Sequence, residues 1–339
     1  MTTGPVLVLG GTGFIGSHLV ERLAREGHRV RAASRSGTWP WETPPAAVEI
    51  SRLDLAGGDC HAALDALLGD SSLIFNVTGA LQRPGTPDRL YEDLHVQGTL
   101  SLLAALERRP ATGATPRLVH VSTTGVLGPT GPLPLAENAR QNPETIYERT
   151  KAEGERRALA AGSDDLEVVV ARPGLVYGER DLHLLGLFRA IASGTFRLIA
   201  GGRACWQPVA VEDVVDGLVK MAAVPGVGGE IFHLAGDRAV SLAEFTGSIA
   251  AALGTRLHGP SLPRPLAWIA GALLEAGCLP LGIDPPLSRM RVATLTADRR
   301  YAIGHAGRRL GWSPEVTLAA GLAAATAWYR ARGLLQDAA

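Results

Sequence analysis

GGTGFIG, residues 10–16, lies between the apolar run PVLVLG (5–10) and the amphipathic stretch FIGSHLVERLAREG (14–27). The apolar run predicts a buried strand, and the amphipathic stretch predicts a helix. Glycines in the turn between them permit a sharp bend, close approach of the backbone to a pyrophosphate, and close packing of helix on strand. The helix N-terminus adds amide donors and a positive dipole. The turn therefore predicts a dinucleotide site formed by Gly10, Gly11, Thr12, Gly13, Phe14, Ile15 and Gly16.

The first half of the chain continues this alternation of apolar runs and amphipathic stretches. Further strands are predicted at 28–35, 47–55, 72–79, 117–125 and 166–174, and further helices at 61–69, 90–108 and 144–161. Strands that alternate with helices are joined by right-handed crossovers, which produce a parallel sheet with helices on both faces. The pattern predicts an α/β fold with a doubly wound parallel sheet.

The pattern changes after residue 175. Helices are predicted at 182–194 and 211–222 and one more strand at 229–236, and from residue 238 helices dominate. We therefore expect two parts. A cofactor-binding sheet domain is predicted to comprise residues 1–176 and about 209–237, and a smaller, mostly helical substrate lobe to comprise residues 177–208 and 238–335.

Composition narrows the function classes. The 33 basic residues balance the 33 acidic ones and gather on no segment, which argues against a nucleic-acid binder. Cys60, Cys205 and Cys278 show no metal-ligand spacing and no disulfide framework, as is usual in a reducing compartment. The N-terminal segment lacks the features of a signal peptide. A cytoplasmic enzyme without a bound metal is expected.

The segment LAWIAGALLEAGCLPL (266–281) is the most apolar stretch of the second half. A transmembrane helix needs roughly 20 apolar residues, and this stretch is shorter and contains Glu275 and Pro280. It predicts a buried or interfacial helix and no membrane span. Whether residues 262–283 form part of a pocket, a dimer contact or a membrane-surface contact stays open at this point.

The end of the second predicted strand bears on the choice between NAD(H) and NADP(H). An NAD site usually places Asp or Glu there, on the ribose hydroxyl, whereas this chain has Ser34 and Arg35. No acidic residue stands at this position to repel a 2′-phosphate. A guanidinium there can bind a 2′-phosphate through paired hydrogen bonds. NADP(H) is therefore favoured, and NAD(H) is retained as an alternative.

Tyr147 and Lys151 stand four residues apart in PETIYERTKAEGE (143–155), and Lys151 is one of only two lysines in the chain. On a helix this spacing places both side chains on one face. The hydroxyl-rich end of a predicted strand, Ser122-Thr123-Thr124, precedes them. Open α/β sheets place their chemistry at the carboxyl ends of strands, so these groups are candidates for one site.

Over nearly its whole length the chain resembles the extended short-chain dehydrogenase/reductase family, which is similar to the NAD-dependent epimerases and dehydratases. The resemblance is carried by GGTGFIG (10–16), Asp54-Leu55, VSTTGVLG (121–128), YERTK (147–151), ARPGLVYG (171–178), VAVEDVVDG (209–217) and RRLGWSPEVTLAAGL (308–322). It implies a Rossmann domain with a small C-terminal substrate lobe.

The resemblance also implies roles for single residues. Tyr147 would be the general acid in carbonyl reduction and the base in the reverse direction. Lys151 would lower the pKa of that phenol and hydrogen-bond the nicotinamide ribose. Thr123 would hold the substrate oxygen, with Ser122 or Thr124 as the alternatives.

Further cofactor contacts follow from the same resemblance. Asp54 would contact the adenine, and Pro173 to Val176 would border the nicotinamide. The full set implied outside the glycine turn is Ser34, Arg35, Asp54, Leu55, Thr78, Gly79, Ala80, Tyr147, Lys151, Pro173, Gly174 and Val176. Members of the family commonly form homodimers through two long helices, here about 90–108 and 144–161, and a homodimer is expected.

Two positions depart from the family pattern. His95 stands where the family usually has Asn, which puts the proton relay behind Lys151 in question; the imidazole could take a related role or simply pack in the helix. Leu127 stands in place of the tyrosine of the family's VYG pattern.

Three functions remain after this comparison. The leading one is an NADP(H)-dependent oxidoreductase that interconverts a carbonyl and an alcohol on a hydrophobic small molecule, closest in character to the hydroxysteroid dehydrogenase and 3-oxoacyl-type reductase branch. Ser34 and Trp206, at positions where sugar-nucleotide members tend to carry Asp and Arg, weaken the first alternative, a nucleotide-sugar 4-epimerase with tightly bound NAD. The second alternative is a regulatory protein that binds NADP without turnover.

Overall fold

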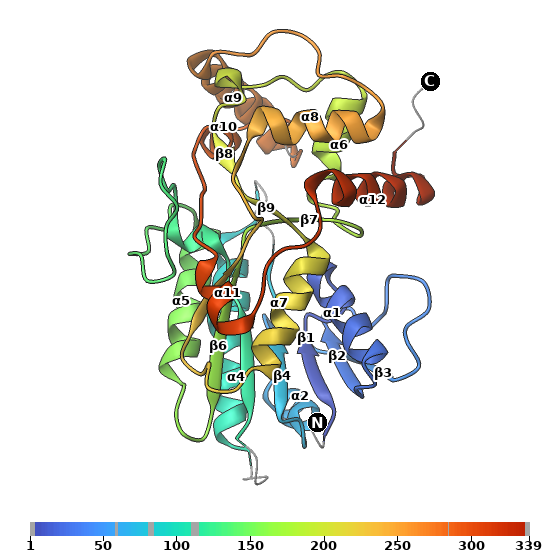
Figure 1. Cartoon of the computed structure of the whole chain (residues 1–339), viewed down its shortest axis with the longest axis vertical. Coiled ribbons are helices and arrows are strands. Elements are labelled where there is room, and N and C mark those ends of the chain that lie inside the picture. The colour runs from blue at the N-terminus through green and yellow to red at the C-terminus, as the bar shows by residue number, and fades with distance from the viewer. Residues whose placement is uncertain (1–3, 58–59, 81–84, 110–114, 284, 336–339) are drawn as a thin grey trace.

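A seven-stranded parallel sheet forms the larger part of the molecule (Figure 1). The computed structural model describes residues 4–57, 60–80, 85–109, 115–283 and 285–335. The strand order is β10-β6-β5-β4-β1-β2-β3, and every neighbouring pair is parallel. The strands are β1 (Val6–Leu9), β2 (Val30–Ser34), β3 (Val48–Arg52), β4 (Leu73–Asn76), β5 (Arg117–Val121), β6 (Glu167–Pro173) and β10 (Ile231–Leu234). The doubly wound parallel sheet that the sequence predicts is thus confirmed.

Helices cover both faces of this sheet. One face packs against α1 (Phe14–Arg25), α7 (Val211–Ala223) and α11 (Gly304–Leu310). The other packs against α2 (His61–Leu68), α4 (Gly98–Glu107) and α5 (Ile146–Ala160). Alternate residues of the central strands enter opposite cores, as Val8 and Leu9 do, because successive side chains of a strand point to opposite faces.

The long helix predicted at 90–108 is not one regular helix. It consists of α3 (Asp88–Tyr91), a π-helical segment (Glu92–Gln97) and α4. A π-helical segment admits an extra residue per turn and is frequent at functional sites. His95 lies inside this segment and is buried.

A smaller lobe lies beyond the carboxyl ends of the strands, at the top of Figure 1. Its helices are α6 (Leu185–Ala192), α8 (Leu242–Leu253), α9 (Arg264–Cys278), α10 (Arg289–Leu295) and α12 (Leu318–Ala331). Two short strand pairs accompany them: β7 (Leu175–Tyr177) with β9 (Pro208–Ala210), and β8 (Cys205–Trp206) with β11 (Val240–Ser241). Phe188, Phe245 and Tyr329 are central to a separate apolar core.

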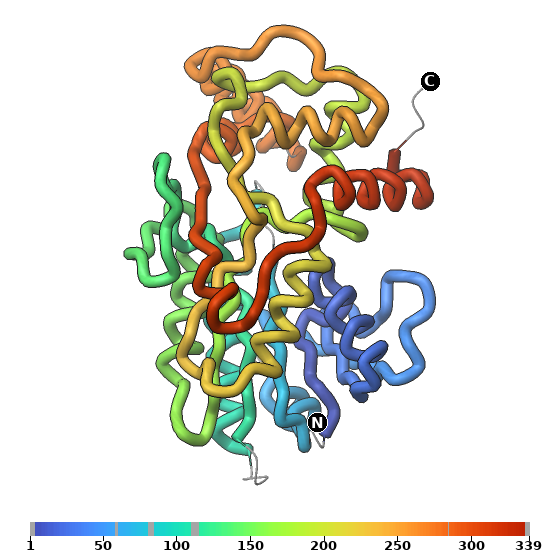
Figure 2. The backbone as a smooth tube through the Cα atoms, in the orientation of Figure 1, coloured from blue at the N-terminus to red at the C-terminus, as the bar shows by residue number. Residues whose placement is uncertain are grey.

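One predicted boundary needs correction. Residues 238–335 do not all belong to the lobe, because Ala306, Leu310 and Trp312 pack into the core on one face of the sheet. The chain returns to the sheet at α11 and then leaves it again for α12, as Figure 2 shows. Trp312 holds this return in place, since its indole Nε1 donates to the carbonyl of Asp213 at 2.9 Å.

The apolar stretch at 266–281 forms α9 and a short 3₁₀ turn (Leu279–Leu281), so the predicted helix is present. It is not a buried helix: Ala267 and Gly271 are its only buried residues. Among the residues that the structure describes, no helix is long and apolar enough to cross a bilayer.

Candidate active site

A cavity of about 860 Å³ lies at the carboxyl ends of the strands, between the sheet and the lobe. The strand order reverses beside β1, because the chain builds β2 and β3 on one side of it and β4 on the other. Ligands of open α/β sheets bind at such a switch point. All predicted site residues except Gly11 line this cavity.

The glycine turn is shaped by contacts that no side chain would permit. Gly10 has φ of +79°, and a Cβ on Gly16 would lie 2.1 Å from the carbonyl oxygen of Gly10. A Cβ on Gly11 would lie 2.8 Å from the Cβ of Ala32, so Gly11 lets the turn pack closely on β2 and does not face the cavity. Trp41, which the sequence did not single out, donates from Nε1 to the carbonyl of Thr12 at 3.2 Å.

Helix α1 begins directly after this turn. Its N-cap is Gly13, whose side chain offers no capping group, and no acidic residue occupies the first turn. The first amides of the helix are therefore left for an anion, which the positive end of the helix dipole also attracts. The turn fits the pyrophosphate of a dinucleotide.

The end of β2 presents hydroxyl and guanidinium groups to the same cavity. Ser34, Arg35 and Ser36 line it, and the Ser34 and Ser36 hydroxyl oxygens are 3.4 Å apart. Arg35 is exposed and has no ion-pair partner within the described parts of the chain. Asp54, after β3, uses Oδ1 to accept a hydrogen bond from the amide of Ala56 at 3.1 Å and also faces the cavity.

Thr123 and Tyr147 meet at the cavity wall. Thr123 Oγ1 accepts a hydrogen bond from the amide of Gly125 at 3.1 Å. Burial raises the pKa of Tyr147 to about 12, and a hydrogen bond with Thr123 acts in the opposite direction. The direction of the shift is contrary to the lowering predicted from the sequence, since desolvation of the phenol outweighs the groups that favour its ionisation.

Lys151 is buried, and two backbone carbonyls hold its ammonium. Nζ donates to the carbonyl of Thr78 at 2.9 Å and to that of Val121 at 3.0 Å. An ammonium has three N–H groups, so one remains for the cavity that Lys151 lines. Burial lowers the pKa of Lys151 to about 8, while the charge of Glu155 raises it.

His95 connects Tyr147, Thr150 and the loop 78–80. Its Nδ1 lies 2.8 Å from Thr150 Oγ1, which donates its own proton to backbone carbonyls of α5. Thr150 therefore accepts from Nδ1–H, and Nε2 accepts from the amide of Ala80 at 3.2 Å. Its ring also packs edge-on against Tyr147, with centroids 5.5 Å apart.

This arrangement answers the question left open at His95. Burial, followed by the charge of Lys151, lowers the pKa of His95 to about 2, so the imidazole is neutral. Its single proton lies on Nδ1, and Nε2 has none to pass toward Lys151. The geometry supports a positioning role for His95 and gives no support to a proton relay through it.

The model of the NAD dependent epimerase/dehydratase family matches residues 6–235. The chain belongs to this family. It is thus a member of the extended short-chain dehydrogenase/reductase group, as its motifs predict.

Individual relatives of this family member cover almost all of its length. It is 30% identical over 329 residues to the 2-alkyl-3-oxoalkanoate reductase of Stenotrophomonas maltophilia, covering 94% of this chain and 97% of that one. It is 28% identical over 325 residues to the 4-hydroxy-2-methyl-3-oxo-4-farnesyl-3,4-dihydroquinoline-1-oxide ketoreductase of Stigmatella aurantiaca, covering 93% of each. The solved structure of MoeE5 in complex with UDP-glucose and NAD superposes with a TM-score of 0.75 at 26% identity, covering 98% of this chain and all of that one.

This epimerase/dehydratase-family chain has site residues that its sequence motifs did not reveal. Arg299 and Tyr301 reach the cavity from the segment between α10 and α11. Arg299 Nη1 lies 3.0 Å from Oε1 of Glu148, the residue after Tyr147. Glu148 also forms a capping box with Thr145 at the start of α5, a T-x-x-E signature that the sequence does contain. Nothing local in the sequence connects Arg299 to it.

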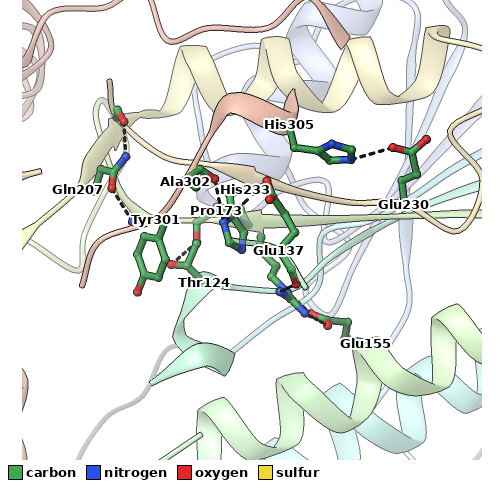
Figure 3. A network of polar contacts seen from close by, with 12 residues as sticks. Thr124, Glu137, Glu155, Pro173, Gln207, Glu230, His233, Tyr301, Ala302 and His305 are labelled. Atoms are coloured by element: carbon green, nitrogen blue, oxygen red, sulfur yellow. Dashed lines mark hydrogen bonds and ion pairs between the residues drawn. The ribbon is translucent and has the colours of Figure 1, made fainter. Parts of the chain in front are cut away.

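A buried ion pair lies behind the side of α5 that faces the cavity. Arg172 Nε donates to Glu155 Oε2 at 2.9 Å and its Nη1 donates to the carbonyl of Glu137 at 2.9 Å. Gln141 adds a hydrogen bond to Glu155 Oε1 at 2.7 Å. Figure 3 shows Glu155 and Glu137 in this network, with Tyr301 beside Thr124. Both charges of the pair are almost fully buried, which fixes α5 against β6.

Proposed function

We propose that this family member is an NADP(H)-dependent reductase that converts a ketone on a hydrophobic small molecule to an alcohol by hydride transfer, with Tyr147 as the general acid. The observation that carries the proposal is the convergence of Thr123, Tyr147 and Lys151 on the cavity that the glycine turn also lines. The bound nicotinamide would supply the hydride. The remaining chemistry falls to side chains of this chain.

The protonation states favour reduction. A phenol whose pKa is raised keeps its proton at neutral pH, and a protonated phenol is the form that can donate to the oxygen of a ketone. Thr123, hydrogen-bonded to Tyr147, is placed to orient that oxygen. Lys151, fixed by two carbonyls, would use its remaining N–H to hold the ribose of the nucleotide.

The preference for NADP(H) rests on the end of β2. Arg35 has no charged partner within the described residues, and the hydroxyls of Ser34 and Ser36 lie beside it. A guanidinium with two neighbouring hydroxyls provides donors for a 2′-phosphate. The neighbour MoeE5 was solved with NAD, so the choice of nucleotide is one of the points that the experiment below must decide.

The proposed substrate class rests on the apolar residues of the cavity lining. The apolar part of the lining includes Leu90, Leu94, Leu175 and Trp206. An apolar lining favours the binding of an apolar substrate, because both surfaces are removed from water. The two reductases compared above are named for compounds with an alkyl or a farnesyl chain. We propose a ketone that carries such a chain.

The test combines turnover with cofactor binding. The purified chain is incubated with NADPH or NADH and a panel of alkyl-chain 3-oxo acids, steroid ketones and nucleotide sugars, and oxidation of each nucleotide is followed; faster turnover with NADH would overturn the NADP(H) preference. The expected result is turnover of an apolar ketone and its loss by a factor of at least 100 in Tyr147→Phe, with NADPH affinity retained. Undiminished turnover in Tyr147→Phe would overturn the mechanism.

The nucleotide-sugar 4-epimerase alternative is kept because MoeE5, at 26% identity, binds UDP-glucose and NAD. It makes an opposite prediction: NAD stays bound through purification, and UDP-sugars alone among the panel raise the melting temperature. Stabilisation by the apolar ketones and not by UDP-sugars would exclude it.

A further inference from the structure

Exposed large apolar side chains are concentrated on one short region of the lobe. Of the nine that the described part of the chain presents, seven lie between residues 266 and 283. They are Leu266, Trp268, Ile269, Leu273, Leu279, Leu281 and Ile283, which we call the α9 face. Scattered single apolar residues are ordinary on protein surfaces, whereas a contiguous group marks an interaction site.

Helix α9 is oriented with its small residues inward. Ala267 and Gly271 are its buried positions, and a Cβ on Gly271 would lie 3.0 Å from the backbone of Ser288. Leu266, Ile269 and Leu273 occupy the opposite stripe, three and four residues apart, and are 57%, 56% and 70% exposed. The helix thus packs on the lobe through its least apolar side and directs its most apolar side outward.

The exposed arc contains no charge. The only charged residues of α9 are Arg264, at its first position, and Glu275, which pairs with Arg289 at 2.6 Å on the protein side. Trp268, at the margin of the arc, carries the single polar side-chain group of the exposed stripe and its flanks, an indole N–H. Tryptophan is the residue that membrane interfaces favour, because its ring is apolar and its N–H reaches water.

One unpaired positive charge lies at the start of this apolar helix, at Arg264. Residues 250–297 contain four arginines and two acids. Arg256 and Arg264 are exposed and have no ion-pair partner within the described residues. An apolar helix face with an unpaired arginine at its end is attracted to a surface of anionic lipid headgroups.

We propose that the α9 face docks on the surface of an anionic lipid bilayer. The helix has 15 residues, too few to cross the hydrocarbon core, so it lies in the plane of the interface. Protein–protein interfaces carry about one hydrogen bond per 100–200 Å², and the exposed arc has almost no group that could form one. The hydrocarbon tails of lipids need no hydrogen-bond partner, so an apolar surface without polar groups suits them.

This docking surface adjoins the cavity of the proposed reductase. Helix α9 packs on α10 at Gly271, and Thr294 of α10 lines the cavity. A bilayer beneath α9 would therefore lie one helix away from the apolar wall at Trp206. Docking itself does not rest on the proposed function, because it is measured without cofactor or substrate.

Sedimentation with vesicles tests the proposal. The full chain is mixed with vesicles of phosphatidylcholine alone or of phosphatidylcholine with 30% phosphatidylglycerol, and the bound fraction is measured after centrifugation. We expect binding to the anionic vesicles, weakened by 0.5 M salt, and at least a tenfold loss of partitioning in Ile269→Glu/Leu273→Glu. The matched control is Leu133→Glu, since Leu133 is 72% exposed and lies outside the α9 face.

The outcomes that overturn the proposal are equally defined. Wild-type protein that stays in the supernatant with both vesicles excludes docking, as does equal binding of the double variant or equal loss in Leu133→Glu. Light scattering that shows Ile269→Glu/Leu273→Glu converting a dimer to a monomer would assign the α9 face to a second copy of the chain. Circular dichroism and melting temperature verify that each variant is folded.

Discussion

Glu155 lies one helical turn beyond Lys151 on the buried side of α5, and its carboxylate raises the pKa of the lysine against the effect of burial. The same carboxylate is held by Arg172 and Gln141. The charge state of Lys151 therefore depends on a residue that does not line the cavity.

Replacing Glu155 should change the pH profile of the enzyme. Because Lys151 has a pKa of about 8, activity that needs its ammonium should decline above about pH 8 in the wild type. In Glu155→Gln the carboxylate charge that raises the pKa of Lys151 is absent, so this pKa falls further. The alkaline decline of kcat/KM should therefore move to lower pH. The variant also leaves Arg172 without its buried partner, at a cost of about 3 kcal/mol in the free energy of unfolding.

The control for this variant is Glu153→Gln. Glu153 lies on the same helix and pairs with the exposed side chains of Arg156 and Arg157. Its profile should match that of the wild type. A wild-type profile in Glu155→Gln as well would show that Glu155 does not set the charge of Lys151.

Lys151→Met should stabilise the fold in a pH-dependent manner. The folded protein binds this proton more weakly than the unfolded chain, because burial lowers the pKa from 10.5 to about 8. Wild-type stability should therefore rise as pH increases from 8 to 10.5, by about 3 kcal/mol in total, whereas methionine cannot titrate. The advantage of Lys151→Met in urea unfolding should be greatest at pH 7 and should shrink by pH 10.

The other lysine provides a matched comparison. Lys220 bonds the surface carboxylate of Asp216 and the carbonyl of Gly311. Lys220→Met should show no such gain at pH 7. A pH-independent difference between Lys151→Met and the wild type would contradict the burial of a charged lysine.

His95 should act through position and not through titration. His95→Leu removes the acceptor for the amide of Ala80 and the donor to Thr150, so kcat/KM should fall about tenfold, as expected for two lost buried hydrogen bonds near the site. His95→Gln, which retains an acceptor, should recover part of this loss. Because the pKa of His95 is lowered to about 2, the wild-type profile should show no inflection from His95 between pH 5 and 8. An inflection there that disappears in His95→Gln would assign a proton-transfer role to the imidazole.

Arg35→Ala should reduce the preference for NADPH. Losing charge-assisted hydrogen bonds to a 2′-phosphate costs about 1.5–3 kcal/mol, which corresponds to a roughly 10- to 100-fold weaker NADPH affinity with NADH affinity unchanged. Arg29→Ala, at the opposite end of β2, is the control and should alter neither. Fluorescence titration of both nucleotides decides the matter, and equal effects on both would remove the argument for a 2′-phosphate contact.

The parts of the site that were predictable from the sequence are those encoded by short-range patterns. The glycine turn could be placed because it lies between a strand and a helix, and Tyr147 and Lys151 could be placed on one face because their spacing is one turn. The direction of the Tyr147 pKa could not be predicted, because it depends on how much water the finished cavity excludes. Arg299 reaches Glu148 across about 150 residues of chain, and no local pattern encodes such a contact.

In the fold, too, the predictable features are those encoded by short-range sequence patterns. Alternation of strands and helices predicted the parallel sheet, but the π-helical segment around His95 interrupts a stretch whose apolar spacing reads as continuous helix. The outward orientation of α9 could not be predicted either. An apolar helix in a sequence indicates contact with an apolar surface, but the sequence does not show whether that surface belongs to the same chain.

The return of the chain to the sheet at α11 has a consequence for the unit of folding. Because Leu310 and Trp312 complete the core beside α7 while α12 completes that of the lobe, neither part contains all of its own core within one continuous segment. A fragment that ends before residue 300 would leave a hydrophobic gap on the sheet, so the cofactor-binding half is not a module that can be excised. The two halves should unfold together in a single calorimetric transition, and the chain should tolerate insertion in its loops better than truncation at its end.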